Sequence, residues 1–456
     1  MGQNQVIAAV STAAGAAIGM VRLSGAGALE VAARVFRPLN SGKQLSKMEG
    51  YTGCLGRVQD TDGEFDEAVA FVYHAPKSYT GEDMVELTCH GGSYLMDRLL
   101  HACLQAGAKP AQPGEFTKRA FLNGKLSLDE AEAVADLIAS RSLQSNRAAL
   151  AAKDGMVFRE ISASTEILLD LAAHLAAWVD YPEEDIPGIS PQELGQGLNR
   201  ADKRLEALEK NFRQGQILKD GVDTVIAGRP NVGKSTLMNL LSGTQKSIVT
   251  HIPGTTRDVV EETALVGDVL LRLSDTAGLR TSDDPVEQIG VQRARQRMEQ
   301  CDLILAVFDG SAPLLQEDLE LLDSLKDRLC IGILNKTDLG LHPDAQVVRE
   351  RLPFIAELCA QRGDGLALLG ELVAKLLGIA ELDPAAPMLA NQRQLDCLRR
   401  GRAAIEEATS ALEAGQTFDA LSVCIDDAIN ALQELTGERA TISVVDRVFH
   451  NFCVGK

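Results

Sequence analysis

Eight consecutive residues, Gly228 to Ser235, match the phosphate-binding pattern G-x-x-x-x-G-K-[ST]. A strand-like run, Thr224–Ala227, comes before them and a helical pattern comes after them, which is the context that this motif requires. The glycines allow backbone N–H groups to surround phosphates at the start of the helix. The Lys234 ammonium can reach the β- and γ-phosphates, and the Ser235 hydroxyl can bind Mg²⁺. The sequence therefore predicts a nucleotide site formed by Asn231, Val232, Gly233, Lys234, Ser235 and Thr236.

Two further motifs follow this P-loop in the order that a Ras-like GTPase requires. The segment Gly254–Asp258 contains Thr255 and Thr256, and Thr256 is the candidate for a second Mg²⁺-binding hydroxyl. The run Asp275-Thr276-Ala277-Gly278 follows a strand-like segment, Val269–Leu273. We expect its aspartate to face the metal from the end of the strand and its glycine to approach the γ-phosphate.

A fourth motif, Asn335-Lys336-Thr337-Asp338, indicates which base is bound. It follows the strand-like run Ile331–Leu334 and is similar to a guanine-specificity motif. A carboxylate at Asp338 can accept hydrogen bonds from both N1–H and N2–H of guanine, and adenine lacks that pair of donors. We therefore expect GTP to be preferred to ATP, with Asn335, Lys336 and Asp338 as nucleotide-binding residues.

The residue after Gly278 is Leu279, where Ras-like proteins place a glutamine that orients the attacking water. An aliphatic side chain cannot polarise water. Either the protein is a very slow switch, or another polar group positions the water and another cation stabilises the charge of the transition state. The residues of the motif alone leave both explanations open.

The composition sets limits on the partners. Of the 456 residues, 45% are apolar and 24% are charged, which is ordinary for a globular protein. The 45 basic and 64 acidic residues give a formal net charge of −19, so we expect any contact with nucleic acid to use a local basic patch or a partner protein. None of the nine cysteines forms a C-x-x-C pair, and no secretion signal is recognisable. We expect a soluble, cytoplasmic protein without a membrane anchor.

The predicted secondary-structure pattern changes three times along the chain. Residues 1 to about 119 are of mixed α/β type, with strand-like runs at Ile18–Leu23, Glu67–Tyr73 and Met84–Cys89. Helical patterns follow, one beginning at the capping box of Ser127 and Glu130, and another at Ser190 and ending near Gly215. A β-loop-α pattern then runs from about 220, and long helices return near 385. This order predicts a nucleotide-binding domain inserted between two helical arms that pack together as one bundle.

Three runs outside the nucleotide motifs carry a resemblance to a known family. They are Tyr79-Thr80-Gly81-Glu82-Asp83 with Glu86 and His90-Gly91-Gly92, the run from Pro113 to Leu126, and the run from Ala131 to Ile138. The chain also ends in Phe452-Cys453-Val454-Gly455-Lys456. With these runs and the nucleotide motifs, the sequence resembles the tRNA-modification GTPase family MnmE (TrmE). The resemblance covers essentially the whole length of the chain.

The resemblance implies a multidomain fold. It places an α/β N-terminal tetrahydrofolate-binding and dimerisation domain at residues 1–119 and an all-α helical domain at residues 120–215 and 380–456. A Ras-like α/β P-loop G domain at residues 216–379 is inserted in the helical domain. The activity implied is K⁺-stimulated GTP hydrolysis that drives modification of C5 of the wobble uridine (U34) of certain tRNAs. The partners implied are a second copy of the chain and an FAD-dependent protein (MnmG/GidA), in a heterotetramer acting on tRNA.

The resemblance also assigns roles to residues. It implies that Asn231 binds K⁺ together with backbone carbonyls of Thr250, Ile252 and Thr255, and that Glu287 orients the water in place of Leu279. It implies that Cys359, Ala360 and Gln361 form the last guanine-contacting loop, where Ser-Ala-Lys is usual. A folate cofactor, 5-formyl- or 5,10-methylenetetrahydrofolate, is expected at Arg22, Glu86, Lys125 and Lys456, and Cys453 is a candidate functional thiol.

Two other functions are alternatives to GTP-driven tRNA modification. A ribosome-assembly switch of the Era type shares the G motifs but is expected to carry a Lys-rich RNA-binding appendage, whereas the segment after the G domain is helical in pattern and acidic. A folate-dependent methyltransferase with an inactive G domain does not explain the intact Mg²⁺ ligands of the nucleotide motifs. Tests on ribosomal subunits and on tRNA would separate these functions.

Overall fold

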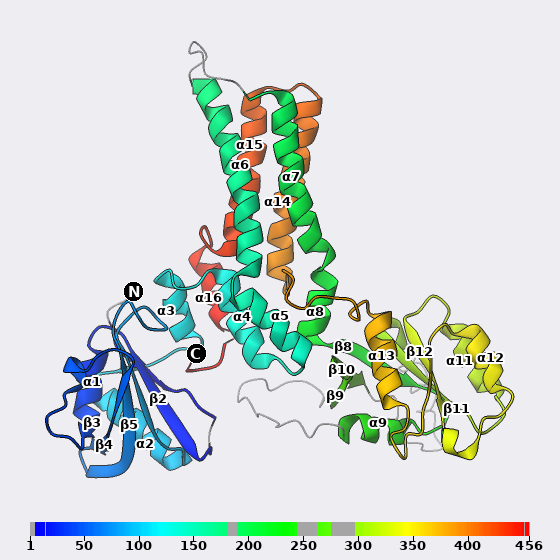
Figure 1. Ribbon diagram of the computed structural model, residues 1–456, viewed down its shortest axis with the longest axis horizontal. Helices are drawn as coiled ribbons and strands as arrows, with labels where there is room; N and C mark the ends of the chain where they lie inside the picture. The colour runs from blue at the N-terminus through cyan, green and yellow to red at the C-terminus, as the bar shows by residue number, and fades with distance from the viewer. Residues whose placement is uncertain are drawn as a thin grey trace, which may run out of the picture. The chain divides into compact units, whose positions relative to one another are not determined.

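The computed structural model describes residues 5–13, 15–180, 189–243, 262–274, 297–450 and 452–455 of the chain. The chain divides into two compact units, and Figure 1 labels their helices and strands. The first unit comprises residues 1–135, 168–188 and 404–456, and the second comprises residues 136–167 and 189–403. The division falls inside three helices, α4 (Leu128–Ala139), α6 (Met156–Asp180) and α14 (Gln392–Glu413). The domain boundaries expected at residues 119, 215 and 379 stay predictions.

The first unit contains a seven-stranded sheet with the order β3-β4-β5-β6-β2-β1-β7. Paired strands are antiparallel except β1 and β7, which are parallel. The strand-like runs expected from the sequence correspond to β2, β5 and β6. The strands are β1 (Ile7–Val10), β2 (Ile18–Ser24), β3 (Phe36–Pro38), β4 (Thr52–Asp60), β5 (Gly63–Tyr73), β6 (Met84–His90) and β7 (Lys109–Pro110).

One face of this sheet packs on two helices, α1 (Ala28–Val35) and α2 (Ser93–Gln105), with a short 3₁₀ turn η1 (Leu45–Lys47) nearby. Side chains alternate between the faces of a strand, so Val21 and Leu23 are buried against these helices while Arg22 points to the opposite face. The register places Arg22 of β2 directly opposite Glu86 of β6. Two predicted site residues therefore meet as a cross-strand pair.

The helices of the first unit enclose an aromatic cluster. The predicted capping box at the start of α4 is present, since Ser127 N donates to Glu130 Oε2 at 2.8 Å and Glu130 N donates to Ser127 Oγ at 3.4 Å. The rings of Phe121, Phe449 and Phe452 pack together beside the start of α4. Phe121 lies in α3 (Glu115–Leu122), Phe449 lies in α16 (Ile442–His450), and Phe452 follows α16. Helix α15 (Phe418–Thr436) lies between α3 and α16 in the sequence.

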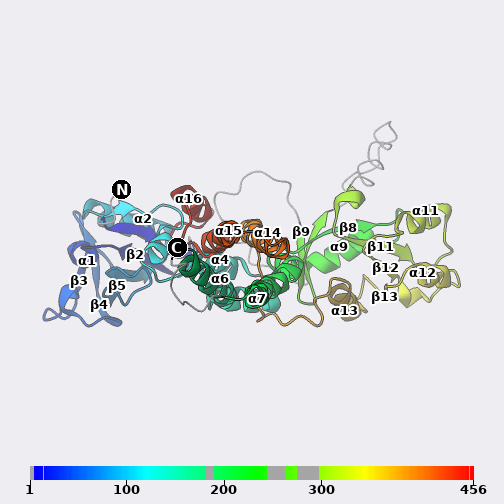
Figure 2. The same ribbon diagram turned by 90° about the horizontal axis from the view of Figure 1, so that it is seen from above.

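The second unit contains a six-stranded sheet with the order β13-β12-β11-β8-β10-β9, in which β9 alone among these strands is antiparallel to its neighbour. Helices α9 and α13 cover one face, and α11 and α12 cover the other; Figure 2 shows α11 and α12 beside β11 and β12. The elements are β8 (Val222–Ala227), α9 (Lys234–Gly243), β9 (Glu262–Val266), β10 (Val269–Ser274), β11 (Leu303–Asp309), α11 (Gln316–Ser324), β12 (Cys330–Asn335), η2 (Thr337–Leu339), α12 (Ala345–Arg351), β13 (Ile355–Glu357) and α13 (Leu366–Leu376).

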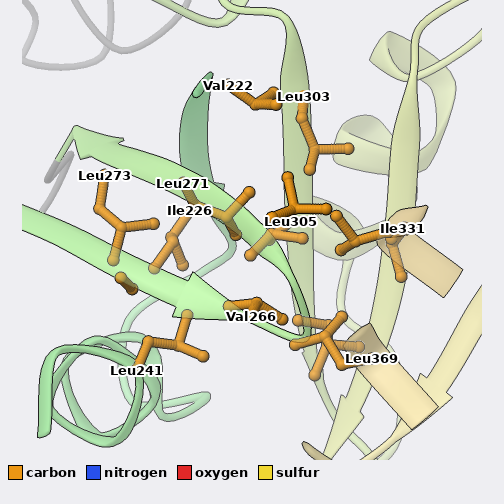
Figure 3. Packing of buried hydrophobic residues seen from close by; sticks show 14 of the residues in the cluster. Val222, Ile226, Leu241, Val266, Leu271, Leu273, Leu303, Leu305, Ile331 and Leu369 are labelled. Carbon is orange, nitrogen blue, oxygen red and sulfur yellow. The ribbon is translucent and has the colours of Figure 1, made fainter. Parts of the chain in front are cut away.

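A continuous apolar core holds this sheet to α9 and α13. Ile226, Leu271 and Leu305 of three neighbouring strands point toward Leu241 of α9 and Leu369 of α13 (Figure 3). All five side chains are at most 2% exposed. Because β8, β10, β11 and β12 run parallel, their carboxyl ends meet at one edge of the sheet, and the loops after β8 and β12 carry the nucleotide motifs.

The remaining helices of the second unit are α5 (Leu143–Lys153), α7 (Pro191–Lys210) and α8 (Phe212–Asp220), with parts of α4, α6 and α14. The predicted start of α7 at Ser190 is confirmed by a capping box with Glu193. The predicted helix end at Gly215 is wrong. Helix α7 ends at Lys210, and after Asn211 a second helix, α8, runs through Gly215 to Asp220. A Cβ on Gly215 would lie 2.3 Å from Leu389 O, so this glycine permits close packing rather than a helix end.

Helices from before and after the G domain pack together within each unit, as predicted. In the second unit Arg402 of α14 donates to Asp202 and Glu209 of α7. In the first unit a Cβ on Gly437, at the end of α15, would lie 2.7 Å from Leu128 Cβ of α4. The G domain is therefore inserted in a helical domain. None of the described helices is long and apolar enough to span a membrane.

Candidate functional site

The loop between β8 and α9 has the conformation that its glycines were expected to supply. Gly228 and Gly233 have φ angles of 150° and 102°, and Asn231 adopts a left-handed φ of 63°. A Cβ at Gly228 would lie 2.4 Å from Val307 O, and a Cβ at Gly233 would lie 2.1 Å from Asn335 Nδ2. Both positions therefore require glycine for steric reasons as well as for φ. Lys234 begins α9, so the loop ends at a helix N-terminus.

The polar side chains of the P-loop lie where a nucleotide could reach them. Lys234 Nζ donates to two carbonyls of its own loop, those of Gly228 at 2.7 Å and Arg229 at 2.9 Å. Asn231, Ser235 and Thr236 are exposed, whereas Val232 is buried beneath the loop. The loop thus presents a cation, an amide and hydroxyls at one rim, which suits a phosphate chain with its metal ion.

Asn335 joins three separate segments of the nucleotide site. This side chain is 3% exposed. Its Nδ2 donates to Val232 O of the P-loop at 2.8 Å, and its Oδ1 accepts from Ala360 N at 3.0 Å. The structure therefore brings together the P-loop, the Asn335–Asp338 motif and the loop of residues 359–361.

Lys336 makes a second bridge to the P-loop. Its Nζ donates to Asn231 O at 2.9 Å and to Asp309 Oδ2 at 2.6 Å. Burial acts to raise the pKa of Asp309, but hydrogen bonds from Lys336 and Ser311 outweigh it and hold that pKa below its usual value. Asp309 is thus an anion that fixes Lys336, although it lies outside the nucleotide motifs of the sequence.

Asp338 is exposed at the short turn η2 (Thr337–Leu339). Its Oδ1 lies 3.2 Å from Cys359 Sγ, and the thiol is the donor. Cys359 and Ala360 are buried, and Gln361 is exposed beside them. The predicted base-binding residues therefore occupy one corner of the second unit, next to the P-loop.

Several predicted residues lie outside the part of the chain that the structure describes. They are the K⁺-site residues Thr250, Ile252 and Thr255, the Mg²⁺ ligand Thr256, the motif Asp275, Thr276, Ala277 and Gly278, the water-orienting Glu287, and the terminal Lys456. Their roles stay predictions.

The first unit holds the second predicted site around Arg22 and Glu86. Arg22 Nε and Nη2 lie 2.9 Å and 2.8 Å from Glu86 Oε1, and Tyr73 donates its hydroxyl to Glu86 Oε2 at 3.0 Å. Burial, then the charge of Glu86 and its hydrogen bond, raise the pKa of Tyr73 to about 12, so Tyr73 stays a donor. The rings of Tyr79 and Phe116 lie 5.8 Å and 5.6 Å from the Arg22 guanidinium carbon.

The C-terminal segment reaches this same pair. Ser11 Oγ and Arg22 Nη1 donate to Gly455 O at 3.1 Å and 3.4 Å, and Gly114 N donates to Cys453 O at 3.2 Å. Cys453 is half-buried in this segment. Lys125 is exposed and donates to Pro76 O at 3.2 Å, in the loop between β5 and β6 that also carries Tyr79.

The runs that carried the resemblance supply an internal network beneath this site. The Arg119 guanidinium donates to Glu82 Oε2 and to Glu115 Oε1, each at 3.0 Å. Ser24 Oγ donates to Glu82 Oε2 at 2.8 Å and lies 2.7 Å from Thr80 Oγ1. This network fixes the Tyr79 loop against α3, and the sequence assigned no individual role to its members. The clustering of Arg and Glu in two short runs was the available signal.

Comparison with known proteins identifies the family. Residues 128–453 match the family described as "MnmE helical domain", and residues 6–125 match "GTP-binding protein TrmE N-terminus". The tRNA modification GTPase MnmE of Symbiobacterium thermophilum is 42% identical over 99% of both chains. Its Heliobacterium modesticaldum counterpart is 40% identical, also over 99% of both chains.

Solved structures of G proteins are similar to part of the chain. An Aquifex aeolicus Era structure is 27% identical, with a TM-score of 0.27, over 40% of this chain and 66% of that one. The G domain of the T. maritima iron transporter FeoB is 27% identical, with a TM-score of 0.26, over 34% of this chain and 98% of that one. The full-length relatives decide the assignment: the chain belongs to the tRNA modification GTPase MnmE family and is a GTP hydrolase.

Proposed function

We propose that this GTPase is stimulated by K⁺ and, with an FAD-dependent partner of the MnmG/GidA type, modifies C5 of the wobble uridine U34 of certain tRNAs. The group added is carboxymethylaminomethyl or aminomethyl, with 5-formyl- or 5,10-methylenetetrahydrofolate as the one-carbon donor. The observation that carries the proposal is the convergence of the P-loop, the Asn335–Asp338 motif and the 359–361 loop on Asn335, in a chain that matches its relatives from end to end.

The nucleotide half of the proposal assigns GTP and Mg²⁺ to the second unit. Lys234 contacts the β- and γ-phosphates, Asp338 reads guanine, and Ser235 with Thr256 binds Mg²⁺. The exposed hydroxyl of Ser235, in the first turn of α9, supports this role because Mg²⁺ prefers oxygen ligands beside phosphates. The metal neutralises charge that develops on the phosphates.

The proposed K⁺ ligand is Asn231, with carbonyls of Thr250, Ile252 and Thr255. The Asn231 side chain is exposed at the P-loop rim and has no hydrogen bond among the described residues, so its amide oxygen is available to a cation. A monovalent cation there supplies the charge that an arginine finger supplies in other GTPases. Glu287 is proposed to orient the attacking water, since Leu279 cannot do so.

The folate half of the proposal uses Arg22, Glu86, Lys125 and Lys456. The Arg22–Glu86 pair supports it, because it offers a cation and a carboxylate beside two aromatic rings on one face of the sheet. The side chains are 14% and 12% exposed, so a ligand would have to share their present hydrogen bonds. Cys453, on the docked terminal segment, is the proposed functional thiol.

The proposed assembly is a homodimer that joins the FAD-dependent partner in a cytoplasmic heterotetramer acting on tRNA. The domains proposed for these tasks are residues 1–119 for folate and dimerisation, 216–379 for GTP, and 120–215 with 380–456 as the helical domain. The acidic surface of the chain supports a division of labour in which the partner contributes to the contact with tRNA.

The experiment is mass spectrometry of wobble uridines in tRNA from cells that lack this protein. We expect the C5 modification to disappear and to return with the parent gene. Ser235→Ala, which removes the proposed Mg²⁺ hydroxyl, should not restore it. Ser242→Ala, which removes a hydroxyl from the last turn of the same helix, is the matched control and should restore it. Normal wobble uridines together with defective ribosomal subunits would contradict the proposal and favour an Era-type function.

A further inference from the structure

A buried ion pair joins the P-loop to α11, the helix that follows β11 in the sequence. Arg229, the second residue of the P-loop motif, donates from Nε to Asp318 Oδ2 at 2.9 Å. Asp318 lies in the first turn of α11 and its side chain is 1% exposed, while that of Arg229 is 16% exposed. The two residues are 89 positions apart in the sequence, so no local motif links them.

The Asp318 carboxylate has an unusual distribution of partners. Its Oδ2 also accepts from Leu315 N at 3.0 Å, which fixes the carboxylate to the start of α11. Its Oδ1 is buried and finds no donor among the described residues. Burying a charged group with an unpaired oxygen is costly, and a pair of apolar side chains would fill the same volume without that cost. The charge is therefore an exception that calls for a physical reason beyond packing.

The backbone of Arg229 supplies that reason. Its carbonyl accepts from Lys234 Nζ at 2.9 Å, so the residue held by Asp318 also holds the ammonium that is proposed to contact the phosphates. Arg229 follows Gly228, which has no side chain with which to hold the loop in place. Asp318 restrains the loop through the long side chain of Arg229, from a helix outside the loop.

We propose that Asp318 is a positioning residue for the P-loop: through Arg229 it fixes the loop geometry and the place of Lys234, and so it sets phosphate affinity without contacting the nucleotide. This inference rests on the proposed role of Lys234 in phosphate binding. It has a specific consequence: loss of the pair weakens all purine nucleotides equally, because the base is read by Asp338 at another part of the site.

The test is a double-mutant cycle on the full-length protein, with GDP and IDP dissociation constants measured by calorimetry at a temperature where each variant is folded. Asp318→Asn and Arg229→Met should each weaken both nucleotides about tenfold or more, with an unchanged GDP/IDP ratio. The double variant should be no weaker than Arg229→Met alone, because both changes break the same contact. Asp323→Asn, on the same helix but in exposed ion pairs, is the matched control and should bind as the parent does.

The outcomes separate the inference from the function on which it rests. Parent-like affinity of Asp318→Asn, or additive losses in the double variant, would overturn the inference. If Lys234→Ala kept the parent affinity, the proposed phosphate site would be wrong and the inference would fall with it. If Asp318→Asn did not fold, Arg229→Lys would carry the test, because it keeps the charge but lacks the guanidinium Nε donor. A parent-like affinity of that variant would count against the inference.

Discussion

Asp129 offers a prediction of how stability depends on pH. This carboxyl group lies in the first turn of α4, is 3% exposed, and accepts a hydrogen bond from Ser127 Oγ at 2.7 Å. Its other oxygen, Oδ2, has no partner among the described residues. Burial raises the pKa of Asp129 from 3.8 to about 7, the charges of Glu130 and Glu132 add to the rise, and the Ser127 hydrogen bond opposes it.

A raised pKa means that the folded protein binds this proton more tightly than the unfolded chain does. The contribution of Asp129 to stability is therefore fully present at low pH and falls as the pH rises from 3.8 toward about 7. With these two pKa values, the Asp129 carboxyl makes the free energy of folding less favourable by roughly 2 kcal/mol near pH 5 and by roughly 4 kcal/mol near pH 8. The cost increases by about 2 to 3 kcal/mol between the two conditions.

Asp129→Asn should remove this dependence. Asparagine keeps an oxygen for Ser127 and exchanges one unpartnered polar atom for another, which is an offset that does not vary with pH. We expect the melting temperature of the variant, relative to the parent, to rise by roughly 5 to 10 °C between pH 5 and pH 8, given the usual ratio of free energy to melting temperature for a unit of this size. Calorimetry would resolve the transition of the first unit.

Asp60→Asn provides the control. The Arg98 hydrogen bond lowers the pKa of Asp60, so that carboxylate stays ionised in both states between pH 5 and pH 8. Its difference from the parent should therefore be constant over this interval. An Asp129→Asn difference that is equally constant would refute the reasoning, because it would mean that the folded state does not hold the proton.

Four further predictions concern the nucleotide site. Asn231→Ala should abolish the stimulation of hydrolysis by K⁺ and by NH₄⁺ with little change in GTP affinity, and equal turnover of the parent in NaCl and KCl would contradict the K⁺ site. Glu287→Ala should lower kcat by about 100-fold or more at saturating K⁺ with little change in the GTP dissociation constant, and a rate within about threefold of the parent would place Glu287 among solvated surface residues. Asp338→Asn should shift preference toward xanthosine nucleotides, and GTP binding by this variant that equals the parent's would refute the guanine assignment. Cys359→Ala should lower the GTP/ITP affinity ratio by about three- to tenfold, whereas Cys359→Ser should preserve it. An unchanged ratio in Cys359→Ala would show that the thiol does not orient Asp338.

The elements that could be predicted from the sequence are those whose own residues determine them. β12 was expected at Ile331–Leu334 and is found at Cys330–Asn335, because all six of its residues are buried, on both faces of the sheet, and most of them are apolar. β9 and β13 were not predicted, since both are short strands at the edges of the sheet. An edge strand depends on hydrogen bonds to one neighbour, which its own composition does not reveal. Gly215 was misread for a related reason, because its close contact with Leu389 comes from a distant part of the chain.

The residues of the candidate nucleotide site could be predicted because each motif is contiguous in sequence. The contacts that hold the motifs together were not predictable in the same way. Asn335 reaches Val232 across 103 positions and Arg229 reaches Asp318 across 89, and only the parallel sheet brings each pair together. Side-chain type states what a residue can bind, while topology decides which partner is within reach.

The same distinction separates two arginines of the first unit. Both Arg22 and Arg119 are nearly buried and both are paired with carboxylates, so residue type and burial do not distinguish a ligand-binding group from a structural one. Arg119 has its bonds divided between two carboxylates and two carbonyls, all internal, and little donor capacity is left. Arg22 pairs with one carboxylate through Nε and Nη2, and its Nη1 donates to the Gly455 carbonyl at 3.4 Å, a long bond to the C-terminal segment. A ligand that carries a carboxylate could displace that weak contact at low cost, whereas at Arg119 it would have to break charged hydrogen bonds. This difference in bonding supports the proposed role of Arg22 and gives Arg119 a structural one.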